Sequence, residues 1–275
     1  MIKMGKLAIV ASGGGMSCSY LAGALLALAE VHNITQPDIV IGGSGAAITL
    51  PYYLAGQYNE IKKVNINYLT SKEFINPLRL KKMVNLDYLI DIICKKIFPL
   101  NIKKLKSLKS KCLIATTNAT NGKLKYFSAK NKEVLNIIKA SLAIPIVYGD
   151  EIKIKEENYI DTYTSSSTEL NIRKAIELGA DKIIVIESSS KSPRLNKLIL
   201  KLFIKFKGKE FEMQYKKDEE KRKQFKVPNN IKVIFLKPET NFNLTILQNK
   251  KSLVWTAMDH AYMEVGENIY LKSFF

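Results

Sequence analysis

The chain has 275 residues, of which 47% are hydrophobic and 25% are charged, a balance typical of a globular protein with a substantial core. Its 43 basic and 25 acidic side chains give a formal net charge of +18, which indicates either an anionic partner or a general enrichment in lysine. The three cysteines lie far apart and form no CxxC pair, so the sequence predicts neither a disulfide framework nor a metal site.

Strands and helices alternate in the first part of the chain. Residues 7–11 form an apolar run typical of a buried strand, and three glycines at 13–15 separate it from an apolar helix over 20–30. A second strand is predicted at 38–41 and a second helix at 46–54. Because this order implies parallel strands with crossover connections, we expect an α/β fold.

The remainder of the chain continues this pattern less regularly. Residues 58–111 are predicted to be mainly helical, and a hairpin is predicted around the turn Asn121-Gly122. Further elements are expected as a helix at 132–142, a strand at 159–161, a helix at 169–178, strands at 182–186 and 231–236, and a helix at about 253–269. Since no repeat or low-complexity linker interrupts the chain, we expect one domain over residues 1–275, with a basic amphipathic insertion at about 191–226.

The first apolar run predicts where the protein resides. Residues 7–11 are too few for a signal peptide, and no apolar segment reaches the roughly 18 residues of a spanning helix. We therefore expect a cytoplasmic protein that can associate peripherally with a membrane.

Ser44 occupies the most informative corner of the sequence. It follows an apolar strand and two glycines, and small residues then open a helix. A serine on such a strand-to-helix corner has an exposed Oγ and a crowded backbone, which requires neighbours with almost no side chain. This pattern is typical of a nucleophile elbow and predicts acyl transfer.

A serine nucleophile also needs a general base. The two histidines, His32 and His260, lie at the end of the first helix and within the last one, and neither follows a strand. Asp161 stands at the end of a predicted strand, so a Ser-Asp dyad fits the sequence better than a triad with histidine. The backbone amides of the glycine loop, at Gly13, Gly14 and Gly15, are suited to form an oxyanion hole.

Five segments occur in one order along the chain. They are SGGG at 12–15, the elbow around Ser44, ASLAIP at 140–145, YID at 159–161 and ELGAD at 177–181. Together they resemble the patatin-like phospholipase family over roughly residues 7–186, and more loosely over the strand at 231–236 and the last helix. The resemblance implies a three-layer α/β/α sandwich with a mainly parallel central sheet.

The same resemblance implies a lipid acyl hydrolase that uses neither a metal nor an organic cofactor. It assigns Ser44 as the nucleophile, Asp161 as the base, and the amides of Gly13, Gly14 and Gly15 as the oxyanion hole. The implied reaction is cleavage of fatty-acyl esters of lipids or phospholipids through an acyl-enzyme.

Three positions depart from the pattern of the family. Ala46 stands where the elbow usually has glycine, and Met16-Ser17-Cys18 stands where the glycine loop usually continues with x-Arg-Gly. Thr162-Tyr163 follows the aspartate, where two small residues are usual. These departures predict a slow or narrow enzyme. They also keep open an alternative, a catalytically weakened lipid-binding or regulatory protein at the membrane surface.

The glycine loop alone is also compatible with a dinucleotide site. That fingerprint requires glycine at the sixth position, where Cys18 stands, and an acidic residue at the end of the second strand, where Gly42-Gly43-Ser44 stands. The sequence therefore favours acyl transfer over nucleotide binding.

A basic stripe lies within the predicted insertion. Arg194, Lys197, Lys201 and Lys205 are spaced by three, four and four residues, with Leu, Ile and Phe over the rest of the helix. Such a helix suits an anionic membrane surface. The alternative is a helix that packs on the core and turns its lysines to solvent. Nucleic acid is not an expected partner, because no aromatic residues alternate with the lysines of 216–223.

Overall fold

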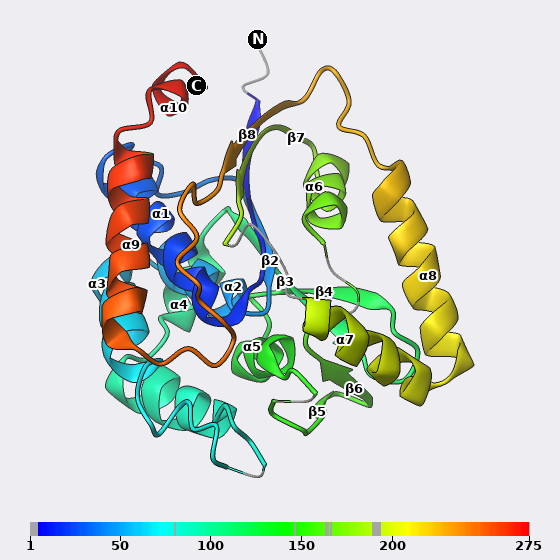
Figure 1. Cartoon of the computed structure of the whole chain (residues 1–275). Coiled ribbons are helices and arrows are strands. Elements are labelled where there is room, and N and C mark those ends of the chain that lie inside the picture. The colour runs from blue at the N-terminus through cyan, green and yellow to red at the C-terminus, as the bar shows by residue number, and fades with distance from the viewer. Residues whose placement is uncertain are drawn as a thin grey trace.

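The computed structural model describes residues 5–79, 81–145, 147–162, 165, 167–188 and 194–274, with the backbone alone for 194–199. Within these residues, eight strands form one sheet in the order β5-β6-β3-β2-β1-β7-β8, and β4 pairs with β3 (Figure 1). The strands are β1 (Lys6–Ala11), β2 (Ile39–Gly43), β3 (Lys111–Asn118), β4 (Leu124–Ser128), β5 (Ile152–Ile154), β6 (Glu157–Ile160), β7 (Ala180–Ile186) and β8 (Lys232–Leu236).

The sheet is mainly parallel, as predicted. Strands β3, β2, β1, β7 and β8 run parallel to one another, whereas β4 and β6 pair antiparallel with β3 and β5 pairs antiparallel with β6. The predicted hairpin is present as β3 and β4, and its Gly122 has a φ of 72°. The carboxyl ends of the parallel strands therefore meet at one edge of the sheet, where the crossover loops begin.

Helices cover both faces of the sheet. They are α1 (Cys18–Glu30), α2 (Ala46–Leu54), α3 (Tyr58–Lys63), α4 (Ile102–Ser107), α5 (Val134–Leu142), α6 (Thr168–Glu177), α7 (Arg194–Lys207), α8 (Lys209–Gln224), α9 (Lys251–Gly266) and α10 (Ile269–Phe274). A 3-10 turn, η1 (Gly15–Ser17), precedes α1, and two π-helices, η2 (Val64–Tyr68) and η3 (Tyr88–Ile97), lie between α3 and α4.

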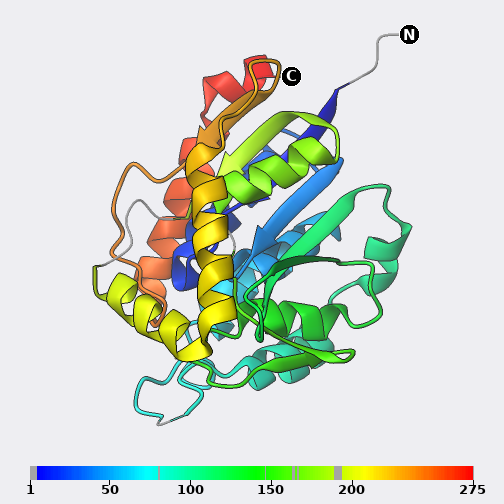
Figure 2. The same cartoon turned by 90° about the vertical axis from the view of Figure 1, so that its right-hand side faces the viewer.

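Alternation along β1 divides the core between the two faces. Ile9 and Ala11 point into a large cluster shared with α1, α2, α5 and α9, and Ala8 and Val10 point into a smaller cluster shared with α6. Figure 2 looks onto this second face, where α6 and α8 lie over the sheet. The predicted three-layer α/β/α architecture is confirmed.

The expected mainly helical character of residues 58–111 is only partly observed. Residues 69–79 and 81–85 are irregular, and there Ile75 bridges to Val84 and the Arg79 guanidinium donates to the carbonyls of Lys72 and Glu73. Pro77 lacks a backbone donor and so disfavours a continuous helix here. The Arg79 hydrogen bonds and the bridge between Ile75 and Val84 join residues that come together only because the chain reverses direction. The spacing of apolar residues along the sequence does not predict such contacts.

Close packing of α9 on α1 closes the larger face. A Cβ built on Gly23 would lie 1.9 Å from the carbonyl oxygen of Met258, so this contact requires glycine. The predicted buried character of α1 is confirmed, since all but its last residue are buried. Within the described residues, no helix combines the length and apolar character needed to cross a membrane.

Candidate active site

Ser44 lies between the end of β2 and the start of α2, as the sequence predicts. Its φ is 53°, a left-handed conformation that costs a serine about 1–3 kcal/mol and that persists where surrounding contacts impose it. Its N–H donates to Ser141 Oγ at 3.0 Å, and Ser141 Oγ donates to the carbonyl of Ala115 at 2.6 Å. Ser141 of α5 therefore fastens the corner to β3, and Ser44 is only 8% exposed.

The glycines beside Ser44 face other backbone and side-chain atoms at close range. A Cβ on Gly42 would lie 2.8 Å from the Cβ of Ala46, and one on Gly43 would lie 2.7 Å from Thr162 Oγ1. A Cβ on Gly45 would lie 2.5 Å from Cys18 Sγ. Ala46 is thus accommodated because Gly42 has no side chain, and Thr162 and Cys18 occupy the space that the other two glycines leave.

The glycine loop runs alongside the serine. A Cβ built on Gly13 would lie 2.8 Å from Ser44 Cβ and 3.4 Å from Ser44 Oγ, so the loop and the nucleophile elbow are in direct contact. Gly15 has a φ of 56°. Within the described part of the chain, the amides of Gly13, Gly14 and Gly15 donate to no acceptor. Three N–H groups at the start of η1 and α1 are therefore available to an anionic ligand.

Asp161 is held at the same edge of the sheet. It follows β6, is 2% exposed, and its own N–H donates to the carbonyl of Ala143 at 3.0 Å. The hydroxyl of Thr117 donates to the Asp161 carbonyl at 2.8 Å. The next residue, Thr162, packs against Gly43 of the serine corner. Tyr163, whose bulk the sequence analysis singled out, lies outside the described residues.

Cys18 lies beside the serine corner. It lies against Gly45, and burial, with a smaller contribution from the charge of Asp161, raises the pKa of the Cys18 thiol to about 12. The thiol is therefore neutral and acts as a small apolar group in this position.

An apolar cleft opens beside Ser44. It contains about 620 Å³ of space, its open mouth included. Its walls come mainly from three parts of the chain: the glycine loop and elbow, residues 65–89, and residues 142–148. Leu69, Phe74, Leu89, Leu142 and Ile144 are representative of this lining, in which Asn65 and Thr49 are polar exceptions.

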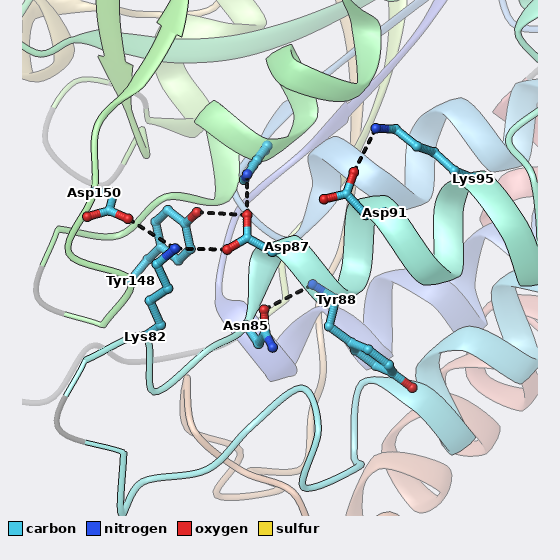
Figure 3. Close-up of polar contacts among 9 residues, drawn as sticks. Lys82, Asn85, Asp87, Tyr88, Asp91, Lys95, Tyr148 and Asp150 are labelled. Carbon is cyan, nitrogen blue, oxygen red and sulfur yellow. Dashed lines mark hydrogen bonds and ion pairs between the residues drawn. The ribbon is translucent and has the colours of Figure 1, made fainter.

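Two walls of the cleft are tied together by an ionic cluster (Figure 3). Asp87 accepts from Lys82 Nζ at 2.8 Å, from Lys139 Nζ, and from the Tyr148 hydroxyl at 3.3 Å, while Lys82 also contacts Asp150 at 3.2 Å. Partial burial opposes the charge of Asp87, but the hydrogen bonds from Lys139 and Lys82 lower its pKa to about 2. Asp87 thus joins residues 82–89 to α5 and the loop that follows it.

The two histidines are engaged elsewhere. His32 Nε2 lies 2.8 Å from the carbonyl oxygen of Val265, and His260 Nδ1 lies 3.3 Å from Glu264 Oε2 in the same helix. Neither borders the cleft. Among the residues that the structure describes, no three His, Cys, Asp or Glu side chains form a group suited to a metal ion.

The basic stripe is helical, as predicted, in α7. Lys201 and Lys205 are exposed, whereas the side chains of Arg194 and Lys197 lie outside the described residues. Part of this helix packs on the rest of the protein, and its binding to a membrane surface stays a prediction. Ile204 packs with Ile160 and Phe211, while Leu202 and Phe206 remain 62% and 88% exposed.

Two serines that sequence reasoning did not single out contact the glycine loop. Ser12 precedes the loop, and Ser188 follows the neighbouring strand β7. The only sequence signal that could have indicated a role for them is their position near the carboxyl end of a buried strand. A serine in that position is too common to indicate a role without the contacts.

The sequence model of one protein family, described as patatin-like phospholipase, matches residues 9–172. The match extends over more than half of the chain and includes Gly13–Gly15, Ser44 and Asp161. The chain belongs to the patatin-like phospholipase family. The resemblance drawn from the five segments is confirmed, and membership of this family supports lipid acyl hydrolase activity as a general class.

Two individual proteins are similar to this chain. One curated relative is the uncharacterized protein YjjU of Escherichia coli (strain K12), 28% identical over 194 residues, which are 67% of this chain and 52% of the relative. The chain therefore spans about half the length of the curated relative that it matches. Among solved structures, VipD from Legionella pneumophila is similar with a TM-score of 0.60 and 14% identity, over 98% of this chain and 67% of VipD. This likeness shows a shared patatin-like fold.

Proposed function

We propose that the protein is a serine acyl hydrolase that cleaves fatty-acyl esters of lipids or phospholipids. Ser44 acts as the nucleophile, Asp161 as the general base, and the amides of Gly13, Gly14 and Gly15 as the oxyanion hole. The observation that carries this proposal is the strained conformation of Ser44, with a φ of 53°, directly beside a loop whose amides have no acceptor among the described residues.

In the proposed reaction, Ser44 Oγ attacks the ester carbonyl carbon while Asp161 accepts the hydroxyl proton. The glycine amides stabilise the oxyanion that develops on the carbonyl oxygen. The tetrahedral species collapses, and the proton passes from Asp161 to the departing alcohol. A water molecule, deprotonated by Asp161, then attacks the acyl-enzyme. The bond from Ser44 Oγ to the acyl carbon breaks, the proton passes from Asp161 to Ser44 Oγ, and the fatty acid is released.

The apolar cleft supports an acyl chain as the group transferred. Its lining is dominated by aliphatic and aromatic side chains, so a chain of methylenes gains burial there, at about 25 cal/mol for each Å² of apolar surface. The thiol of Cys18 is neutral in this lining and does not compete as a nucleophile.

The departures from the family pattern leave the proposed oxyanion donors in place. Those donors are backbone groups, which survive a side-chain substitution unless the loop itself moves. Ser17, at the position where arginine is usual, donates from its hydroxyl to the carbonyl of Leu244 at 2.9 Å. The loop is therefore fixed by a neutral hydrogen bond, and the lost positive charge is consistent with a slow enzyme more than with an inactive one.

We also propose that α7 helps the protein to bind an anionic membrane surface. Lys201 and Lys205 supply positive charge, and Leu202 and Phe206 supply exposed apolar surface on the same helix. Ile204 packs against Ile160, which immediately precedes Asp161, so α7 lies beside the edge of the sheet that carries the proposed base.

Hydrolysis by purified variants tests the proposed function. We expect Ser44→Ala to lower the turnover of a short chromogenic ester and of phospholipid in mixed micelles by about 10³-fold or more. Asp161→Asn is expected to lower turnover by about 10²–10⁴-fold, because it removes a general base. Ser110→Ala is a matched control, since Ser110 is also buried but lies before β3, at the opposite end of that strand from the cleft. Wild-type turnover by Ser44→Ala would refute the assignment.

A further inference from the structure

Ser188 makes a close side-chain contact to the glycine loop. It is buried directly beyond β7, and its hydroxyl donates to the carbonyl of Gly13 at 2.6 Å. Its own N–H donates to Ser12 Oγ at 2.9 Å, and the two hydroxyls lie 3.2 Å apart. Ser12 and Ser188 thus clamp the loop from the side of β7.

The clamp fixes the orientation of one peptide group. In a trans peptide the carbonyl and the following N–H point in opposite directions. Because the carbonyl of Gly13 is directed at Ser188, the N–H of Gly14 is directed away from Ser188. A Cβ on Gly14 would lie 2.6 Å from Ser188 Oγ, which confirms that this side of the loop is filled, and the Gly14 amide has no acceptor among the described residues.

Ser12 and Ser188 each follow a strand in the centre of the sheet. β1 and β7 pair in parallel, with Ala11 opposite Ile186, and the N–H of Ser12 donates to the carbonyl of Ile186 at 2.9 Å. Ser12 and Ser188 each follow these paired residues closely. A group held in this way keeps its direction when a substrate arrives, which is the condition for stabilising a charge that appears only in the transition state.

We propose that Ser188 is a positioning residue that orients the Gly13–Gly14 peptide as an oxyanion donor. The inference rests on the proposed acyl hydrolase function, and it assigns a role to a side chain outside the Ser44–Asp161 pair. Ser188 does not touch the substrate. It acts through the loop, and Ser12 supports it by accepting from its N–H.

The test compares Ser188→Ala with Ser188→Thr, which keeps the hydroxyl, and with Ser110→Ala as the control. For a short chromogenic ester, we expect Ser188→Ala to lower kcat by about 10- to 100-fold, less than the roughly 100- to 1000-fold typical of losing an oxyanion donor outright. KM is expected to change by less than about twofold, because the ground-state ester gains little from the donor. Ser188→Thr is expected to keep kcat within about fivefold of wild type.

A trifluoromethyl ketone inhibitor separates positioning from a general structural effect. Its hemiketal with the catalytic serine carries the oxyanion, so its affinity is expected to fall by the same factor as kcat in Ser188→Ala, at an unchanged thermal midpoint. Ser12→Ala removes the acceptor for the Ser188 amide and the hydroxyl that lies 3.2 Å from Ser188 Oγ. It is expected to show the same pattern, a lower kcat with little change in KM, at a smaller loss, and it decides the question if Ser188→Ala does not fold.

Two results would overturn the inference alone. One is wild-type kcat and inhibitor affinity in both Ser188→Ala and Ser12→Ala while Ser44→Ala is inactive. The other is a lower kcat in both Ser188→Ala and Ser188→Thr that is accompanied by a lower thermal midpoint. Wild-type activity in Ser44→Ala would instead refute the proposed function, and the inference would fall with it.

Discussion

Ser44 has a left-handed backbone conformation, and several of the residues around it are glycines whose position leaves no room for a side chain. Gly13, Gly42 and Gly43 each approach another atom so closely that a Cβ would collide, at 2.8 Å or less. The conformational cost of Ser44 is offset by contacts that impose it, above all the bond from its N–H to Ser141. This part of the site was predictable from the sequence, because glycine spacing around a serine is a local signal.

Asp87 carries a prediction about acid stability at the same scale. Its folded-state pKa, about 2, lies below its ordinary value of 3.8, so its charge stabilises the folded protein above about pH 4, and this contribution is lost as the pH falls towards 2. Because the side chain is 40% exposed, we expect Asp87→Asn to destabilise the protein by only about 1 kcal/mol at pH 7. The difference from wild type in urea midpoint should shrink between pH 4 and pH 3.

Asp91→Asn is the control for this measurement. Asp91 pairs with Lys95 one turn along the same helix, in an exposed i,i+4 pair that contributes about 0.3–0.5 kcal/mol. An Asp87→Asn protein no less stable than Asp91→Asn at neutral pH would show that the ionic cluster does not hold the walls of the cleft together.

At the scale of elements, the sequence predicts those that depend on a local pattern and does not predict those that depend on tertiary contacts. The strands at β1 and β2 and the hairpin at Asn121-Gly122 follow from continuous apolar runs and a turn-forming pair, which are local properties. The irregular structure of residues 69–79 and 81–85 could not be predicted, because it is held by Arg79 and by the bridge from Ile75 to Val84. The role of Ser188 depends on the pairing of β1 with β7, which brings together residues 175 positions apart.

Packing of α9 on α1 gives a prediction for Gly23. Gly23→Ala would place a methyl group 1.9 Å from the carbonyl oxygen of Met258, so the two helices must separate. We expect a loss of about 1–3 kcal/mol or more in the free energy of unfolding, measured by urea denaturation. Gly266→Ala, in α9 itself, is the matched control, since its methyl would lie 3.5 Å from Val31 in ordinary contact. Equal stability of the two variants would contradict the close packing.

At the scale of the whole molecule, the proposed catalytic groups and α7 share one edge of a continuous sheet. We propose that residues 1–275 act as one patatin-like domain with α7 and α8 inserted between β7 and β8, because Ile204 and Phe211 pack against Ala119 and Ile160 of the antiparallel end of the sheet. The formal charge of +18 would then attract the protein to an anionic surface that presents the lipid substrate.

Liposome flotation tests this arrangement. We expect the double variant Lys201→Gln and Lys205→Gln to bind anionic vesicles more weakly by about 2 kcal/mol, roughly 30-fold at low salt. The double variant Lys217→Gln and Lys223→Gln, on α8, removes the same charge from another helix and is expected to bind nearly as wild type does. Equal binding by the two double variants would assign the membrane affinity to overall charge and not to α7.

The central claim is that Ser44 is the nucleophile, and covalent labelling tests it most directly. A fluorophosphonate probe phosphonylates a serine only where a base and an oxyanion hole activate it. After incubation of the purified protein with the probe, peptide mapping by mass spectrometry should find one adduct, on Ser44, and Ser44→Ala should carry none. Labelling of Ser44→Ala equal to that of wild type, or no adduct on Ser44 in the wild-type protein, would contradict the account.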